Sequence, residues 1–204
     1  WLAKLDLRLR DPFSHKLKRL ADLVLAVFGL LLSLPLVLPV LMIIAIDSGF
    51  PLFFKQKRTG FMGRPYTLYK LRTMKRDAEK KGAEWAREKD QRVTRCGKFL
   101  RKWRIDEIPQ FWNVVKGEMS IVGPRPERPE FQEELIEKVP HWNCRHLVKP
   151  GLTGWAQIRF RYASGMDDSE EKLSFDLYYV KHASLLMDLQ IMLSTLRSIA
   201  RGSR

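Results

Sequence analysis

The stretch Leu23–Ile46, LVLAVFGLLLSLPLVLPVLMIIAI, is an apolar run of 24 residues that contains no charged side chain. As an α-helix rising about 1.5 Å per residue, such a run is just long enough to cross the hydrocarbon core of a bilayer. Pro35 and Pro39 lie near its middle, where each removes a backbone hydrogen bond and promotes a kink. The run therefore predicts a membrane helix with a break at Pro35.

Basic segments flank this run on both sides. Residues 1–19 carry six Lys and Arg, and residues 48–76 carry eight with no acidic residue among them. Positively charged flanks tend to stay on the cytoplasmic side, whereas a single crossing would carry one of them through the membrane. A re-entrant helix-break-helix, which enters and leaves by the same face, satisfies both flanks, and Ser33 is a candidate partner for carbonyls freed at the break. We therefore expect the re-entrant form, with a true span as the alternative.

The overall charge narrows the class of partner. The chain has 204 residues, which is typical of one compact domain, and a formal net charge of +14. Such a charge calls for an anionic partner: nucleic acid, lipid headgroups or a phosphorylated substrate. We expect no nucleic acid, because the basic residues are dispersed and a Leu-rich run is out of place in such a protein. Residues 1–19 fit a helix on anionic membrane lipids, or else a solvated segment.

A second informative stretch is Arg101–Glu127, RKWRIDEIPQFWNVVKGEMSIVGPRPE. Asp106 suits the N-cap of a helix that Gly117 closes, and residues 121–122 predict a short buried strand before a Gly-Pro-Arg-Pro turn. The adjacent carboxylates of Asp106 and Glu107 have two interpretations. Asp-Glu-x-Pro is a good helix start that needs no chemistry, and it is also a candidate acidic site.

The remaining patterns complete a fold prediction. Two strands, at residues 52–57 and 65–73, form a hairpin around a turn at 60–63, and helices are expected at 75–90, 129–138, 169–181 and 185–201. Residues 149–155 predict a loop. The expected fold class is α/β, mainly helical with a small β-hairpin. Residues 1–50 would form the amphipathic segment and re-entrant membrane hairpin, and residues 51–204 a domain at the cytoplasmic face that carries the acidic pair, together one structural unit.

Five ordered motifs, together with Arg101, carry a resemblance to a known family. They are YKLRTM at 69–74, DEIPQ at 106–110, MSIVGPRP at 119–126, KPGLTGWAQ at 149–157 and DLYYVK at 176–181. In this order they resemble the bacterial sugar transferase family, the monotopic polyprenol-phosphate phosphoglycosyl transferases. The resemblance runs from about Lys16 to the end and is closest to the catalytic domain of larger, exopolysaccharide-type members. Since the chain opens at Trp1, we expect a piece of a longer protein.

This resemblance implies a reaction and roles for particular residues. A sugar-1-phosphate would move from a nucleoside diphosphate sugar to polyprenol (undecaprenyl) phosphate, at the cytoplasmic face of the bacterial inner membrane. Asp106 would be the nucleophile that forms a covalent phosphosugar intermediate, and Asp106 with Glu107 would hold Mg²⁺, because paired carboxylates favour a hard ion. The phosphate-binding arginines would be Arg101, Arg125 and Arg161.

Two questions stay open at this level. A non-catalytic, basic membrane-surface binding protein would explain the charge and the apolar run, although it leaves the acidic pair and the Pro-Arg-Pro turn unexplained. The sequence also leaves open whether the chain forms a homo-oligomer.

Overall fold

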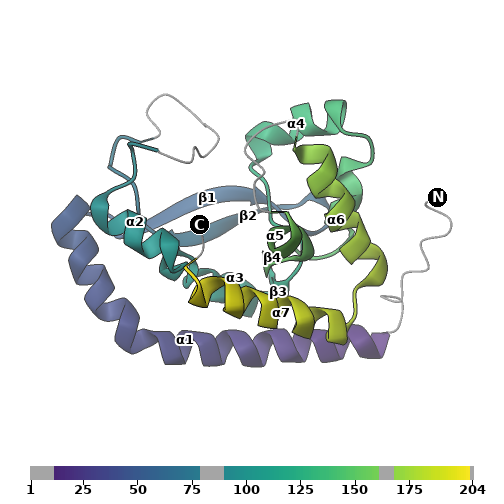
Figure 1. Cartoon of the computed structure of the whole chain (residues 1–204), viewed down its shortest axis with the longest axis horizontal. Helices are drawn as coiled ribbons and strands as arrows, with labels where there is room; N and C mark the ends of the chain where they lie inside the picture. Colours follow the sequence, from purple (N-terminus) through teal and green to yellow (C-terminus); the bar gives the residue numbers. More distant parts are fainter. Residues whose placement is uncertain (1–11, 79–89, 161–167, 203–204) are drawn as a thin grey trace.

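A computed structural model of the chain describes residues 12–78, 90–160 and 168–202. Its longest element is α1 (Pro12–Ser48), which runs along the bottom of Figure 1 and then bends upward at the left. Pro35 and Pro39 both lie inside α1, and no residue between its ends leaves the helical state. The sequence predicted two helices separated by a break, so this detail is wrong: the prolines are accommodated within one bent helix.

Ser33 lies two residues before Pro35, which removes one main-chain hydrogen bond from α1. Pro35 has no N–H for the carbonyl of Leu31. The Ser33 hydroxyl donates to the neighbouring carbonyl, that of Leu30, at 2.9 Å. The prediction that Ser33 pairs with a carbonyl freed at the break is therefore not confirmed, because Pro35 leaves the Leu31 carbonyl without its donor and Ser33 bonds that of Leu30.

The predicted hairpin is present. β1 (Phe53–Thr59) and β2 (Pro65–Leu71) pair antiparallel, with Phe53 opposite Leu71, and a 3₁₀ turn, η3 (Phe61–Gly63), connects them. The short strand predicted before the Gly-Pro-Arg-Pro turn is β3 (Ser120–Val122). It pairs in parallel with β4 (Gly151–Thr153), so the loop expected at residues 149–155 instead contains a strand.

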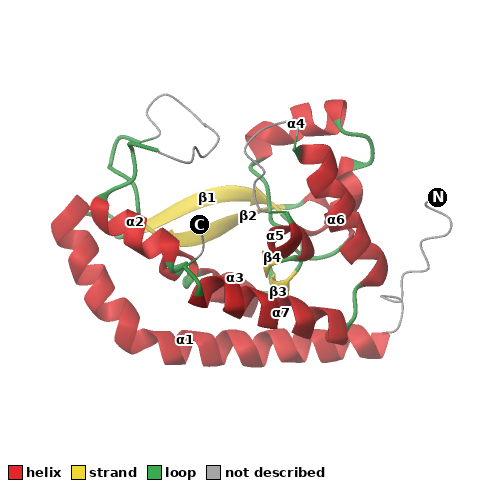
Figure 2. Cartoon of the chain, viewed as in Figure 1, coloured by secondary structure: helices red, strands yellow, loops and turns green. Residues whose placement is uncertain are grey.

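Helices surround these two small sheets, and the fold is mainly helical, as predicted (Figure 2). The helices expected at 129–138, 169–181 and 185–201 are confirmed as α4 (Pro129–Lys138), α6 (Ser169–His182) and α7 (Leu185–Ala200). The helix expected at 75–90 falls largely outside the described residues. Five shorter elements complete the described part of the chain: α2 (Arg95–Lys102), α3 (Gln110–Lys116), α5 (Trp155–Arg159) and the 3₁₀ helices η4 (Ile105–Glu107) and η5 (Trp142–Leu147).

Polar contacts join the first part of α1 to the rest of the chain. Lys18 Nζ lies 2.6 Å from Asp188 Oδ2 on α7, and Arg19 donates to the carbonyls of Val114 and Val115 at the end of α3. The apolar core beside these contacts includes side chains from α1, the hairpin, α3, β3, α6 and α7. The start of the apolar helix is therefore packed against the part of the chain that carries the acidic pair. The division at residue 50 stays a prediction.

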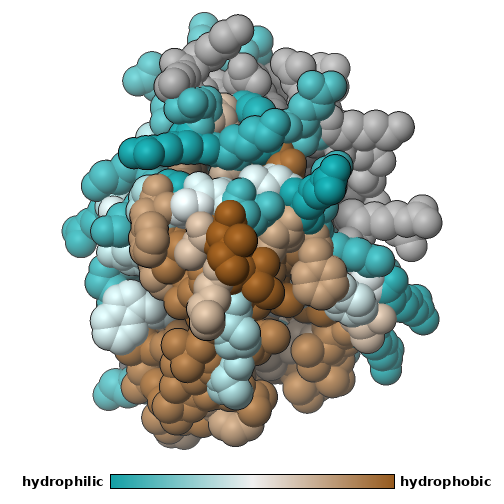
Figure 3. Space-filling model, turned by 90° about the vertical axis from the view of Figure 1, so that its left-hand side faces the viewer, coloured by the Kyte–Doolittle hydropathy of each residue, from teal (hydrophilic) through white to brown (hydrophobic). Residues whose placement is uncertain are grey.

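Much of α1 is nevertheless uncovered. It is the one helix of the described chain that is long and apolar enough to cross a membrane. Leucines on α7 are exposed as well, among them Leu186 and Leu196. Figure 3 shows apolar surface gathered over the lower part of the molecule and polar surface above it. Membrane association follows from this large apolar face.

Candidate active site

The acidic pair lies in a short 3₁₀ turn, η4 (Ile105–Glu107), where both carboxylate side chains are buried. Arg104, before this turn, has the left-handed φ of 53°, which redirects the chain out of α2. The α-helix begins only at Gln110, after Pro109, so the prediction that Asp106 caps it is wrong. Gly117 does close that helix, with φ 83°, a conformation that glycine adopts without strain.

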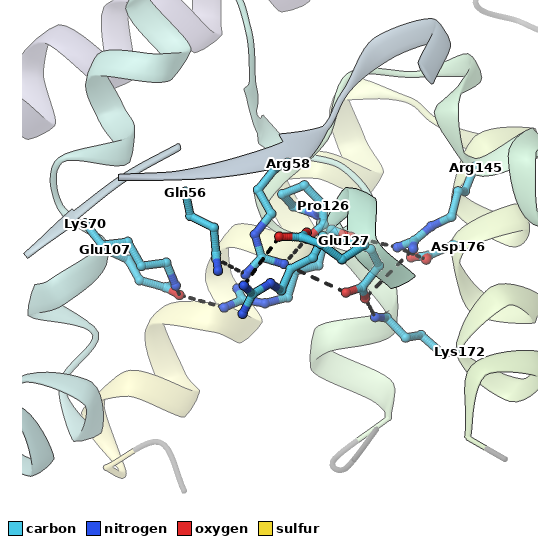
Figure 4. A network of polar contacts seen from close by, with 12 residues as sticks. Gln56, Arg58, Lys70, Glu107, Pro126, Glu127, Arg145, Lys172 and Asp176 are labelled. Carbon is cyan, nitrogen blue, oxygen red and sulfur yellow. Dashed lines mark hydrogen bonds and ion pairs between the residues drawn. The ribbon is translucent and has the colours of Figure 1, made fainter. Parts of the chain in front are cut away.

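Glu107 forms ion pairs with three cations, and Figure 4 shows one of them, Lys70, beside it. Its Oε1 lies 2.9 Å from Lys70 Nζ on β2 and 2.7 Å from Arg125 Nη2 in the Pro-Arg-Pro turn. Its Oε2 lies 3.3 Å from Arg104 Nη1. Burial by itself would raise the pKa of Glu107, but Arg125, Lys70 and Arg104 together hold it well below the usual range. Glu107 is therefore ionised and gathers three positive charges beside Asp106.

Asp106 differs from its neighbour. Within the described part of the chain, no Lys or Arg forms an ion pair with its carboxylate. Burial raises the pKa of Asp106, and the charge of Glu107 raises it further, while Lys70, Arg101 and Arg125 act against both. The two carboxylates therefore differ in their surroundings. Glu107 forms ion pairs with three cations, whereas the buried Asp106 forms none within the described chain.

The predicted phosphate-binding arginines lie in different positions. Arg125 reaches the acidic pair directly, and the charge of Glu107 raises its pKa. Arg101, half-buried on α2, donates through Nε to the Thr73 hydroxyl at 2.9 Å. Burial lowers the pKa of Arg101, although the nearby Asp106 opposes this effect. Arg161 falls outside the described residues.

Comparisons with known proteins agree with this geometry. A family model described as bacterial sugar transferase matches residues 13–202, nearly the whole chain. This chain belongs to the bacterial sugar transferase family.

Relatives within the family carry related names. The chain is 42% identical over 194 residues to the UDP-N-acetylgalactosamine-undecaprenyl-phosphate N-acetylgalactosaminephosphotransferase of Aeromonas hydrophila, covering 95% of this chain and 46% of that protein. It is 40% identical to the UDP-glucose:undecaprenyl-phosphate glucose-1-phosphate transferase of Escherichia coli K12, over 89% of this chain and 40% of that protein. It is 42% identical to the uncharacterized sugar transferase EpsL of Bacillus subtilis, over 90% of this chain and 87% of that protein. The chain thus spans less than half of the first two relatives and most of the third.

The carboxylate oxygens of the acidic pair are of the type that Mg²⁺ binds. The described residues contain no cluster of three or more His, Cys, Asp or Glu side chains that could hold a metal alone. Mg²⁺ often takes only one or two protein carboxylates, and substrate phosphates and water supply the other oxygens. Asp106 is free of ion pairs, and Oε2 of Glu107 has only the longer contact, to Arg104. These are the oxygens that would hold the ion.

Two residues that contact the acidic pair, Lys70 and Arg104, were not among the site residues predicted from the sequence. Lys70 belongs to the motif YKLRTM and lies on a strand, but a strand pattern does not identify the carboxylate that its lysine meets 37 positions later. Arg104 lies three residues before Glu107, and only its left-handed backbone brings it back to the acidic pair. For Lys70, the signal in the sequence was its place in YKLRTM, a motif that also carries the resemblance.

Proposed function

We propose that this chain is the catalytic part of a phosphoglycosyl transferase that moves a sugar-1-phosphate from a UDP-sugar to undecaprenyl phosphate. The observation that carries the proposal is the buried acidic pair, in which Asp106 lies unpaired beside the Lys70, Arg104 and Arg125 charges on Glu107. A diphosphate substrate repels a lone carboxylate, so a nucleophilic carboxylate needs such cations around it. The names of the relatives support the same substrate pair.

The first half-reaction uses Asp106. A carboxylate oxygen attacks the sugar-bearing phosphorus, an Asp–O–P bond forms, and the bond between that phosphorus and the bridging oxygen breaks. UMP departs with the electron pair, and a phosphosugar remains on Asp106 as an acyl phosphate. No proton has to move, because the attacking and leaving groups are both anions.

The second half-reaction restores the site. A phosphate oxygen of undecaprenyl phosphate attacks the same phosphorus, and the Asp106 carboxylate leaves. The product is an undecaprenyl-diphosphate sugar, the first lipid-linked sugar of a polysaccharide or glycoconjugate. Because the lipid substrate lies in a membrane, a catalytic part packed against an apolar helix brings Asp106 to it.

The surrounding residues have distinct tasks in this scheme. Arg125 and Lys70 would bind the phosphate oxygens as negative charge develops on them, and Arg101 would bind the diphosphate from the side of α2. Glu107 holds Lys70 and Arg125 together between turnovers. A Mg²⁺ ion, held by Asp106 and Glu107, would neutralise diphosphate charge.

Turnover measurement tests the proposal directly. Protein in detergent or nanodiscs is mixed with undecaprenyl phosphate and a panel of UDP-sugars, and UMP release is recorded. At least one sugar should give release, EDTA should abolish it, and Mg²⁺ should restore it. A protein that binds anionic vesicles and releases no UMP from any sugar nucleotide would instead be the non-catalytic membrane-surface protein.

The membrane part of the proposal is a re-entrant α1 in the bacterial inner membrane, with the active site at the cytoplasmic face. The support is the pair of basic flanks and the bend in the helix that holds Pro35 and Pro39. Basic flanks tend to stay on the cytoplasmic side, and both flanks can do so only if both ends of α1 face the same compartment.

Cysteine labelling distinguishes this topology from a true span. In a background without Cys96 and Cys144, single cysteines near Lys16 and near Lys57 should both react from the cytoplasmic side. Replacement of Pro35 and Pro39 by Ala should favour a straighter helix, and with it labelling of one flank from the periplasm. Periplasmic labelling of one flank in the protein with both prolines would contradict the re-entrant topology.

A further inference from the structure

The turn that carries Arg125 is held through its main-chain carbonyls. Pro124 and Pro126 have no N–H, so the backbone on either side of Arg125 offers mainly acceptors. Four consecutive carbonyls are bonded to three different parts of the chain: β4, η5 and the end of β1. The pairs are Pro124 O with Gly151 N at 3.0 Å, Arg125 O with Arg145 Nη2 at 2.7 Å, Pro126 O with Arg58 Nη1 at 3.1 Å, and Glu127 O with Thr59 N at 3.0 Å.

Arg145, on η5, holds the middle of this turn from inside the protein. Its side chain is only 1% exposed, and Nη2 also lies 2.7 Å from Asp176 Oδ2 on α6. The guanidinium stacks over the Trp142 ring, 4.4 Å from its centroid. A buried cation is stable only with a counter-charge, so Asp176 and Trp142 together fix the place from which Arg145 donates to Arg125.

Arg58, on β1, holds the neighbouring carbonyl from the opposite side (Figure 4). Its Nη2 donates to Gln56 Oε1 at 2.6 Å, and Glu127 Oε2 lies 3.9 Å from its Nη1. Glu127 in turn is paired with Lys172 of α6. The two guanidiniums thus belong to one buried network that continues through Glu127 into α6.

We propose that Arg145, oriented by Asp176, and Arg58 are positioning residues that place the Arg125 guanidinium beside Glu107 and the reacting phosphate. This inference rests on the proposed function. An arginine side chain has many rotamers, and it binds a phosphate effectively only if the backbone that carries it is held in place. The network holds the backbone of Arg125 in this way. It also gives a role to the DLYYVK motif, because Asp176 is the first residue of that motif.

The first measurement is the effect of Arg145→Lys. Lysine keeps the charge next to Asp176, but it lacks the planar guanidinium that lies over Trp142 and holds Nη2 between Asp176 and the Arg125 carbonyl. Turnover per folded molecule should fall roughly 10–100-fold, the scale of a small misplacement at a reacting centre. Thermal melting of the same preparation reports the folded fraction.

A double-mutant cycle then separates positioning from stability. If Arg145 acts through Arg125, Arg145→Lys should cost little more, about twofold or less, once Arg125→Ala has removed the side chain that is being placed. Ile191→Ala is the control for lost stability, because Ile191 on α7 is fully buried in a core cluster that includes neither Trp142 nor Arg145. It should leave turnover per folded molecule nearly unchanged in both backgrounds.

Equal losses from Arg145→Lys with and without Arg125 would overturn the positioning role. Should Arg145→Lys fail to fold, Arg58→Lys makes the same test at the Pro126 carbonyl, and its 19% exposed side chain tolerates replacement better. The proposed function is tested separately by the unmutated protein. Absence of UMP release there overturns the function itself, whereas an active protein with additive losses overturns only the inference.

Discussion

Replacing Asp106 by Asn is expected to abolish the covalent half-reaction while leaving the protein folded. The unmutated enzyme, mixed with its UDP-sugar alone, should release UMP and gain the mass of one phosphosugar. Labelled UMP should then exchange into the UDP-sugar without any undecaprenyl phosphate. Asn keeps the size of the side chain but has no anionic oxygen to attack phosphorus, so both the mass increase and the exchange should disappear.

Stability should not explain this loss. Burial and the charge of Glu107 raise the pKa of Asp106, which means that folding disfavours its ionised form. A neutral residue of the same shape removes that cost, so the melting temperature of Asp106→Asn at neutral pH should equal or exceed that of the unmutated protein. A folded Asp106→Asn protein that still gained phosphosugar would rule out Asp106 as the nucleophile. The phosphosugar would then be attached to another residue, or it would pass directly to undecaprenyl phosphate in a ternary complex.

Local patterns predicted most of the fold. The hairpin, the strand before the Gly-Pro-Arg-Pro turn and helices α4, α6 and α7 each have their signal within a few residues, in apolar spacing, glycine and proline. The errors arose where distant residues decide the outcome. Residues 149–155 contain a strand only because β3 lies beside them, and the prolines of α1 bend a helix that remains continuous. Neither a partner strand nor the persistence of a helix through proline is encoded locally.

The site was predictable in its residue types but not in its connections. The family resemblance pointed to Asp106, Glu107 and Arg125 as site residues, and the structure brings Arg125 to the acidic pair. The pairing of Glu107 with Lys70, and of Arg145 with Asp176, joins residues that are 37 and 31 positions apart and that only the packed fold brings together. The capping role given to Asp106 failed for a related reason, because the left-handed Arg104 inserts a 3₁₀ turn before α3. The role of these residues as substrate ligands stays a prediction.

Replacing Arg125 by Ala should have the second-largest effect. Turnover should fall roughly 10²–10³-fold, or about 2.7–4 kcal/mol, the usual loss for a group that stabilises transition-state charge. Folding should survive, because Glu107 keeps Lys70 at 2.9 Å and Arg104 at 3.3 Å as counter-charges. The turn should also persist, since its carbonyls are held by Gly151, Arg145, Arg58 and Thr59, and none of these contacts uses the Arg125 side chain.

The measurement compares turnover, UDP affinity and melting temperature of Arg125→Ala with those of Arg95→Ala, an exposed arginine on α2 that tests for a general effect of charge. Loss confined to Arg125→Ala, with weaker UDP binding and unchanged melting, would assign it to the phosphates. Arg125→Lys should recover only part of the activity, because an ammonium does not reproduce the two parallel bonds that a guanidinium makes to phosphate. An Arg125→Ala protein that melts early but turns over normally per folded molecule would mean that the ion pair with Glu107 is structural. Lys70 and Arg101, the other described cations whose charge acts on Asp106, would then become the first candidates for binding the phosphate.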